Sequence, residues 1–392
     1  MLDLGLSASA RRHFLHSLTW DHSVRVRVEV LDMSDNLVSD VTHLLMSGQV
    51  DGAQDGRYRS SAAKVGLWDP EHKLQFDTAA PMHGQLFADR MLSVTYGVRV
   101  WRLGAWVDIP VFRGPVTAAR REGPVLAVEC VGKESLVDKP VWSVVTYPKG
   151  SKITDAIRDL MRRSGEAEGN IAVPDWPNRF PADQILGRRE NTWARATRFA
   201  QVMGAFLFYT GDGVARVERP SDNVVFTFRD GPSALADHGP TVLSDPRAQF
   251  ATDGLVNVVR VVGQPKAAGE AAPSAVAALP TDHPLNSHRL GRRGSQRILP
   301  EWLEDRDIRS TADAQALADR TLAARSREYV HVTFDSLPVP FLTAGDMCAV
   351  QTARTVVPSF RLSEYSLPLG HDGAMSVGTR RRVHELNRRR WR

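Results

Sequence analysis

The chain has 392 residues, of which 42% are hydrophobic and 24% charged, and its formal net charge is +5 at pH 7. This composition excludes a disordered or collagen-like chain, and the length favours two or three domains. The charge is concentrated at one end, because residues 380–392 carry +6 and residues 1–379 therefore sum to −1. Such a basic end is typical of a solvated arm and less often of a contact with nucleic acid or an acidic partner. The candidate partner or DNA contacts are Arg388, Arg389, Arg390 and Arg392.

The N-terminal sequence is not expected to act as a signal peptide. The first residues lack the apolar stretch of a signal peptide, and no run approaches the roughly 18 apolar residues of a membrane span. We therefore expect a protein made and held in the cytoplasm until assembly, without membrane insertion. Cys130 and Cys348 lie in strand-like runs and are interpreted as small core residues, since no disulfide framework or metal-ligand spacing surrounds them.

Strands dominate the first third of the chain. The run VRVRVEVLD, from Val24, alternates apolar and charged residues, which is typical of a half-buried antiparallel strand. Further short runs, bounded by Gly, Pro or Asp, predict a barrel or sandwich. The clearest hairpin turns at REGP. It is expected to place Val116 and Val128 toward a core, and Arg120 and Arg121 toward water.

Helical periodicity begins near Ser151, which is the predicted N-cap of a first helix that ends before Gly165. A second helix is predicted in NTWARATRFAQVMG, with Gly204 suited to a left-handed stop. The apolar stripes of the two helices are expected to comprise Ile153, Ile157, Leu160 and Met161, and then Trp193, Ala196, Thr197, Ala200 and Met203.

The stretch FLFYTGDGVARVERP, residues 206–220, raises the question of a phosphate-binding loop. A dinucleotide fingerprint needs G-x-G-x-x-G between a strand and a following helix. Here the third glycine is missing and the next element is a strand. We therefore predict a hairpin, in which Gly211 or Gly213 supplies the positive φ of the turn.

The last third is predicted to contain a long loop, one helix and several strands. Residues 264–298 are rich in Ala, Gly, Pro and polar residues and are interpreted as the loop. Ser310 and Asp313 resemble a capping box at the start of the helix. Its buried face is expected to comprise Ala314, Leu317, Ala318, Thr321 and Leu322.

The order of these elements predicts an α+β, mainly β fold. Its domains are residues 1–140, a β-barrel; residues 141–250, a central α+β domain with two helices and a hairpin; and residues 251–392, a β-barrel with the loop, the helix and the basic arm.

Motifs for catalysis are missing. The chain has no H-E-x-x-H helix, no nucleophile elbow and no Walker loop, and HELNR, from His384, lacks the second zinc ligand. His283 and His288 are interpreted as solvated loop residues. The acidic phrase EWLEDRD, residues 301–307, is interpreted as structural, because carboxylates are favoured before a helix. We expect no catalytic, cofactor-binding or metal-binding residues and no enzyme activity, although an active site assembled from distant residues stays open.

Several phrases, in their order along nearly the whole chain, resemble minor tail proteins of actinobacterial siphophages, within the class of tail-tip or baseplate hub proteins. The phrases are VGLWDPEHKL, VFRGPVTAARREG, YPKGSKITDAIRDLM, ENTWARATRFAQVMGAFLFYTGDGVARVERP, GLVNVVRVVG, STADAQALADRTLAAR, LPVPFLTAGDMCAV and SEYSLPLGHDGAMSVGTRRR.

This resemblance implies a structural virion protein at the phage tail tip. It implies two hub-type β-barrel modules flanking the mixed central domain, and a homotrimer whose six barrels match a hexameric tail tube. The implied partners are the distal tail protein, the tape measure protein and further tip proteins, with DNA passing only transiently. No cofactor is implied.

Three alternatives stay open at this point. The chain is a hexameric distal tail ring protein, a tail-associated cell-wall hydrolase, or a nucleic-acid-binding protein that uses residues 380–392 with Trp391. Oligomer mass, peptidoglycan cleavage and salt-sensitive DNA affinity separate these alternatives.

Overall fold

The computed structural model describes residues 4–20, 23–55, 58–74, 86, 89–188, 190–231, 238–250, 255–265, 270–305, 308, 310–325, 329–354, 356–370 and 373–382. The chain divides into two compact units, which are Met1–Pro246 with Thr333–Gly378, and Arg247–Val332 with Thr379–Arg392. This division differs from the predicted boundary at residue 251, because residues 333–378 join the first unit. The candidate contacts Arg388, Arg389, Arg390 and Arg392 lie outside the described residues.

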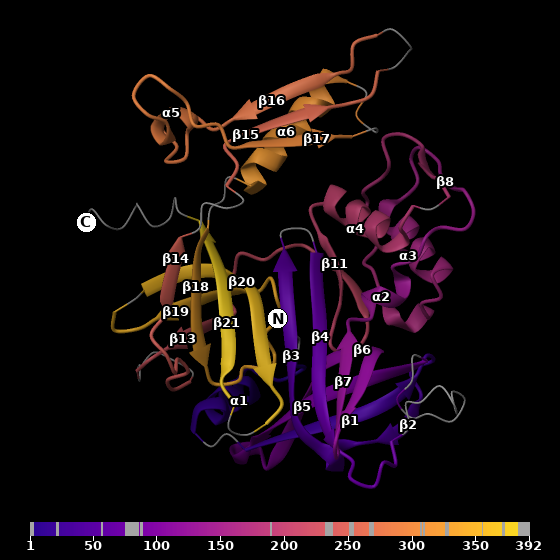
Figure 1. The fold of residues 1–392 in the computed structure, drawn as a ribbon, viewed down its shortest axis with the longest axis vertical. Helices are drawn as coiled ribbons and strands as arrows, with labels where there is room; N and C mark the ends of the chain where they lie inside the picture. The colour runs from indigo at the N-terminus through magenta and orange to yellow at the C-terminus, as the bar shows by residue number, and fades with distance from the viewer. Residues whose placement is uncertain are drawn as a thin grey trace. The chain divides into compact units, whose positions relative to one another are not determined.

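Most of the strands in the first unit belong to a 13-stranded sheet (Figure 1). Its path runs β14-β18-β21-β20-β3-β4-β7-β6-β5-β1-β2, and β19 joins β13 to β20. Most pairs are antiparallel, whereas β13 and β19 are parallel. The strands are β1 (Val24–Asp32), β2 (Leu37–Asp40), β3 (Leu45–Asp55), β4 (Tyr58–Trp68), β5 (Arg90–Val100), β6 (Ala105–Glu122), β7 (Val125–Val131), β13 (Phe226–Arg229), β14 (Arg247–Phe250), β18 (Tyr329–Ser336), β19 (Met347–Gln351), β20 (Val356–Pro368) and β21 (Met375–Arg382).

One strand pair joins the N-terminal and C-terminal segments of this sheet. β20 runs antiparallel to β3, with Glu364 opposite Ala53 and Pro368 opposite Gln49. Figure 1 shows the two strands side by side. The sheet is therefore continuous across segments that the sequence assigns to separate domains.

The hairpin of β6 and β7 confirms the predicted REGP turn, with Gly123 at φ 58. Val116 and Val128 are buried, as expected. The prediction that both arginines face water is wrong for Arg121. Consecutive side chains of a strand point to opposite faces, and Arg121 lies half-buried with its Nη2 2.8 Å from Asp69 Oδ2.

Helix α1 (Ala8–Trp20) was not predicted from the sequence. Ser7 precedes it, and the Ser7 Oγ accepts a hydrogen bond from the Ala10 N–H at 3.2 Å, which is a side-chain cap. Phe14 and Leu18 of this helix are buried, and the ring of Phe14 meets the edge of Phe341 with centroids 5.8 Å apart. The apolar side chains of α1 therefore pack on the core of the first unit. Two short 3-10 turns, η1 (Thr42–Leu44) and η2 (Trp101–Leu103), connect strands.

The central segment contains the two predicted helices, α3 (Ile153–Arg163) and α4 (Thr192–Val202), and the residues of both predicted stripes are buried. The predicted N-cap of α3 is wrong, because Lys152 occupies that position and Ser151 instead pairs through its backbone with Phe180. The other elements here are β8 (Val145–Tyr147), β9 (Ile171–Ala172), β10 (Gln184–Leu186), β11 (Phe206–Tyr209), β12 (Ala215–Glu218), α2 (Glu134–Val137) and η3 (Glu168–Asn170).

The second unit is built on a three-stranded sheet of β15 (Val258–Val262), β16 (Ser274–Ala278) and β17 (Pro300–Glu304), in the order β16-β15-β17. One face packs on α6 (Thr311–Arg325). The Ser310 Oγ accepts from the Asp313 N–H at 3.1 Å, which confirms Ser310 as the N-cap of this helix. Ala314, Ala318, Thr321 and Leu322 are buried, whereas Leu317 is partly buried.

The prediction of one continuous loop over residues 264–298 is wrong, because this segment contains β16 and α5 (Ser287–Leu290). The strand SAVAA is alanine-rich, and alanine has little strand propensity. Its residues nevertheless alternate between exposed and buried, which is the period of a strand. The acidic phrase EWLEDRD was interpreted as structural because it precedes a helix. Its residues 301–304 instead belong to strand β17, and Glu301 forms an ion pair with Arg325 at 3.1 Å.

The fold is thus mainly β with helices packed on it, in agreement with the predicted class. Cys130 and Cys348 are free and buried, as expected for core residues, and burial raises the pKa of the Cys130 thiol to about 12. In the described part of the chain, no helix has the length and apolar character needed to span a membrane.

Candidate functional site

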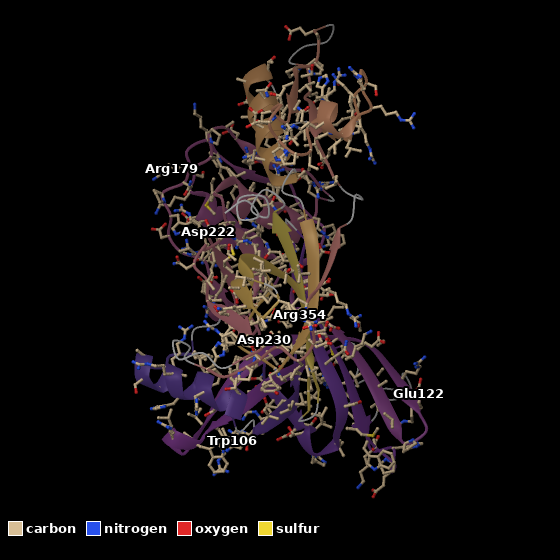
Figure 2. The ribbon with its side chains drawn as sticks, turned by 90° about the vertical axis from the view of Figure 1, so that its left-hand side faces the viewer. Trp106, Glu122, Arg179, Asp222, Asp230 and Arg354 are labelled. Atoms are coloured by element: carbon tan, nitrogen blue, oxygen red, sulfur yellow. The ribbon has the colours of Figure 1, made fainter. Side chains whose placement is uncertain are left out.

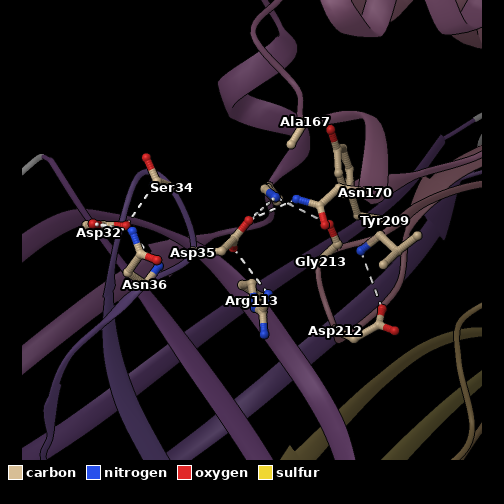
Figure 3. Close-up of polar contacts among 12 residues, drawn as sticks. Asp32, Ser34, Asp35, Asn36, Arg113, Ala167, Asn170, Tyr209, Asp212 and Gly213 are labelled. Atoms are coloured by element: carbon tan, nitrogen blue, oxygen red, sulfur yellow. Dashed lines mark hydrogen bonds and ion pairs between the residues drawn. The ribbon is translucent and has the colours of Figure 1, made fainter.

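A buried ion cluster around Lys133 connects the large sheet to the central segment. Lys133 follows β7, and its side chain is only 4% exposed. Its Nζ lies 3.1 Å from Asp35 Oδ2 and 3.1 Å from Glu166 Oε1. Arg113 of β6 adds a second cation, with Nη1 3.2 Å from Asp35 Oδ1 (Figure 3). Two positive and two negative groups therefore balance one another, which a buried cluster requires.

The turn between β1 and β2 presents Asp35 to this cluster. The Asp32 carboxylate accepts hydrogen bonds from the backbone N–H groups of Ser34 at 2.8 Å and Asn36 at 2.9 Å. A further hydrogen bond from the Asn36 side chain, which is the main cause, lowers the pKa of Asp32. Asp35 itself has φ 65, a left-handed conformation that aspartate tolerates. The turn is thus held by local hydrogen bonds that do not involve the other residues of the cluster.

The central segment supplies the carboxylate of Glu166 and two further donors. Asn170 Nδ2 bridges Asp35 Oδ2 at 2.9 Å and Glu166 Oε1 at 3.1 Å. Tyr209 Oη donates to Glu166 Oε2 at 2.6 Å. Burial, together with the charge of Glu166, raises the pKa of Tyr209 far above its ordinary value, so the phenol stays a donor. Each carboxylate oxygen of Glu166 therefore has a partner.

The glycine turn of the β11–β12 hairpin docks on β6. Gly213 has φ +80, as the turn prediction requires, and its carbonyl accepts from Lys133 Nζ at 3.4 Å. A Cβ at Gly211 would lie 2.2 Å from the carbonyl oxygen of Pro110. The hairpin prediction is confirmed, since β11 and β12 pair antiparallel around this turn. The two glycines permit close approach of two backbones.

A cavity of about 40 Å³ lies beside the cluster. Its volume suits water or a small ion, because one water occupies roughly 10–15 Å³ on this measure. Glu134 lies in its wall and accepts from the Ser61 N–H at 3.4 Å, while a Cβ at Gly132 would meet its carboxylate at 2.2 Å. Burial raises the pKa of Glu134 to about 7. The lining residues include Arg59, Ser60, Ser61, Glu134, Thr210 and Tyr365.

Glu134→Gln is expected to stabilise the protein at pH 8 by about 1–2 kcal/mol, with little effect near pH 5. The folded state holds the Glu134 proton up to about pH 7, whereas the unfolded chain releases it near the ordinary value of 4.5. Stability therefore falls as pH rises between these values, and glutamine removes the loss. Urea unfolding at both pH values measures the difference, with exposed Glu129→Gln as the control. An equal effect of Glu134→Gln at both pH values would contradict the assignment.

The described residues contain no cluster of metal-ligating side chains. No group of three or more His, Cys, Asp or Glu side chains among them could hold a metal ion. His288 is exposed and lies 2.8 Å from Gln296, whereas His283 Nδ1 accepts from the Leu285 N–H at 3.2 Å. Sequence reasoning found the glycine turn of this site but missed Lys133, Asp35 and Glu166, whose contacts are made across long sequence separations.

Neither a protein-family profile nor a curated protein sequence matches the chain. Solved structures do match it, among them the following three. The 43 kDa tail protein of prophage MuSo2 from Shewanella oneidensis has a TM-score of 0.59 at 11% identity, over 92% of this chain and 98% of that one. The tail protein from Neisseria meningitidis has a TM-score of 0.57 at 15% identity, over 91% and 96%. Prophage tail protein gp18 from Listeria monocytogenes has a TM-score of 0.53 at 9% identity, over 90% and 94%.

The chain has the fold of these phage tail proteins. The likeness extends over nearly the full length of each, so it includes both the large sheet and the central segment. The shared fold agrees with the fold that the tail-protein resemblance implies, whereas the finer resemblance to actinobacterial siphophages remains a prediction.

An unpaired strand edge and several apolar side chains of the described chain are exposed to solvent. In the described residues, β2 pairs only with β1, and Leu37 and Val38 of β2 are 60% and 42% exposed. Aromatic residues are exposed at the end of the β5–β6 hairpin, where Arg99 stacks 3.6 Å from the ring centroid of Trp101 and Arg25 stacks 4.6 Å from that of Trp106. Figure 2 shows Trp106 projecting outward from the sheet. Open edges and exposed aromatic groups are features of association surfaces.

Proposed function

We propose that the protein is a structural component of a phage tail tip, a baseplate hub that forms a homotrimeric ring. In this proposal the ring adapts the six-fold tail tube to the tip and lets DNA pass on ejection. The observation that carries it is the likeness to tail proteins over 98% of the length of one of them. The proposed partners are the distal tail protein, the tape measure protein and further tip proteins, within the virion.

The division into two hub-type barrels per subunit is part of the same proposal. Support comes from the strand order of the large sheet. Strands β3 to β7 are neighbours in one part of the sheet and strands β18 to β21 in another, and within the described residues the two parts are joined only by the pairing of β3 with β20. A ring of such subunits needs contacts between unlike surfaces, because each subunit must meet two neighbours. The open edge of β2 is the proposed contact within the ring.

We expect the purified protein to have the mass of three chains by native mass spectrometry. Leu37→Lys on the β2 edge is expected to weaken assembly by about tenfold or more, because it places an unpaired ammonium group in the interface. Val202→Lys is the matched control, since Val202 is 53% exposed on α4 and not on a sheet edge. Six chains would support the distal tail ring instead. A single chain at high concentration, or a cleared band on peptidoglycan, would contradict the proposal.

A further inference from the structure

A basic segment of the second unit begins in the last turn of α5, and we define it as residues 289–297 and call it the basic loop. Its four arginines are all exposed, and residues 283–300 contain no Asp or Glu. Two other arginines of this unit have partners, because Arg325 forms an ion pair with Glu301 at 3.1 Å and Arg260 stacks 5.0 Å from the ring centroid of Trp302. No ion pair joins a described carboxylate to the arginines of the basic loop, which are Arg289, Arg292, Arg293 and Arg297.

Buried asparagines hold this loop in place. Asn257 is 1% exposed, and its Nδ2 donates to the carbonyls of Leu285 at 3.1 Å and Arg297 at 2.9 Å. Its Oδ1 accepts from the Leu299 N–H at 2.8 Å. Asn286 Nδ2 donates to the Leu279 carbonyl at 2.7 Å. Side chains of the core are thus used to anchor both ends of the loop.

The loop is also closed on itself. The Arg297 N–H donates to the Ser287 carbonyl and the Ser295 N–H to the Arg292 carbonyl, both at 2.9 Å. Gly294 has φ +81, and a Cβ at Gly291 would lie 2.2 Å from the Ser295 carbonyl oxygen. The arginines therefore extend from a backbone that is already ordered, which lowers the entropic cost of binding a ligand.

The chemistry of the loop fits a phosphate polymer. Guanidinium groups bind phosphate oxygens through two parallel hydrogen bonds. Between Gly291 and Arg297 every residue is Gly, Ser, Gln or Arg, so this stretch offers no apolar core for a protein partner. We propose that the basic loop binds the phosphodiester backbone of DNA without reading its sequence. The inference deepens the proposed passage of DNA, but it rests on one chain and does not require the trimer.

Such a contact is compatible with the movement of DNA. Four guanidinium groups neutralise about four phosphates, which gives a weak and strongly salt-dependent contact. The chain outside residues 380–392 sums to −1, so the four arginines of the basic loop are a local excess of positive charge.

The test measures binding of the full chain to a random-sequence DNA duplex by fluorescence anisotropy, between about 50 and 200 mM salt. For four phosphate contacts, the logarithm of affinity is expected to fall with the logarithm of salt at a slope of about −3 to −4, or about 100-fold over this range. Replacing all four loop arginines with glutamine should remove most of that slope and lower affinity at low salt by at least about tenfold.

A charge-matched variant separates the loop from the C-terminal arm. It carries Gln at the four arm positions, Arg388, Arg389, Arg390 and Arg392, and removes the same charge. Binding that survives in the arm variant and fails in the loop variant supports the inference. Binding lost only in the arm variant would overturn it, as would equal affinity for polyglutamate or for anionic phosphatidylglycerol vesicles.

Mass and circular dichroism of each variant keep the two proposals distinct. A loop variant that stays folded, keeps the wild-type mass and loses DNA supports the loop assignment. A wild-type protein that is monomeric, yet binds DNA through the loop, would contradict the trimer and leave this inference standing. A loop variant that binds DNA as wild type does would overturn the inference, whatever its mass.

Discussion

Replacing Lys133 by methionine is expected to destabilise the first unit by about 3–5 kcal/mol. The side chain is 4% exposed and contacts two carboxylates, Asp35 and Glu166, at 3.1 Å each. Methionine fills a similar volume but leaves these carboxylates with fewer cations than negative charges. Removing one partner of a buried ion pair costs far more than the pair contributes, because the remaining charge has lost its compensation. Urea unfolding followed by circular dichroism measures the loss.

Lys152→Met is the matched control for this experiment. Lys152 forms an ion pair with Asp175 at 2.8 Å, but the two side chains are 32% and 61% exposed. The expected loss is below about 1 kcal/mol, since water solvates both charges when the pair is absent. A second variant, Lys133→Met with Glu166→Gln, should recover part of the stability because the uncompensated charge is removed. Equal losses for Lys133→Met and Lys152→Met would contradict the assigned role of the buried cluster.

Elements whose signals are local were predictable from the sequence. The stripes of α3 and α4 follow a helical period, and Gly204 ends the second helix with φ 71. Asn191 caps α4 through its Oδ1, which accepts from the Ala194 N–H at 2.8 Å. These features depend on neighbours within one or two turns, so periodicity and the C-terminal glycine indicated α4, and periodicity indicated α3. Local signals were not sufficient everywhere, because the N-cap of α3 was misplaced and α1 was missed.

Pairings between distant segments were not predictable in the same way. β20 pairs with β3 although the partners Glu364 and Ala53 are 364 − 53 = 311 residues apart in the sequence, and nothing in either strand specifies its partner. The strand pattern predicted a barrel or sandwich, and the resemblance implied two barrel modules in separate domains, whereas the described sheet passes from one segment to the other. Alanine-rich β16 was assigned to a loop, because composition outweighed its alternation.

The Lys133 cluster illustrates why the candidate site was found only in part. Lys133 contacts Asp35, which is 98 residues away, and the Gly213 carbonyl, which is 80 residues away. A lysine after a strand is ordinarily exposed, so local sequence predicts the opposite of what the fold imposes. The glycine turn was identified by its own chemistry, but its docking surface on β6 is set by tertiary packing.

Two neighbouring glycines of that turn have different physical roles. Gly213 adopts φ +80, so any other residue there strains the backbone. Gly211 is not among the described glycines with a positive φ. A Cβ at this position would, however, lie 2.2 Å from the Pro110 carbonyl oxygen. A substitution at Gly211 therefore probes the close approach of the turn to β6 without changing the turn conformation.

Gly211→Ala is expected to destabilise the protein by about 3 kcal/mol, at the upper end for overpacking, because the obstructing atom belongs to the backbone and cannot rotate away. The turn must withdraw from β6, and the Gly213 carbonyl then moves away from Lys133. Hydrogen exchange of the β11–β12 amides should increase together with the loss of stability. Gly169→Ala is the control, since a Cβ there meets no atom within 4 Å. Unchanged exchange and stability in Gly211→Ala would show that the turn does not dock on β6 in solution.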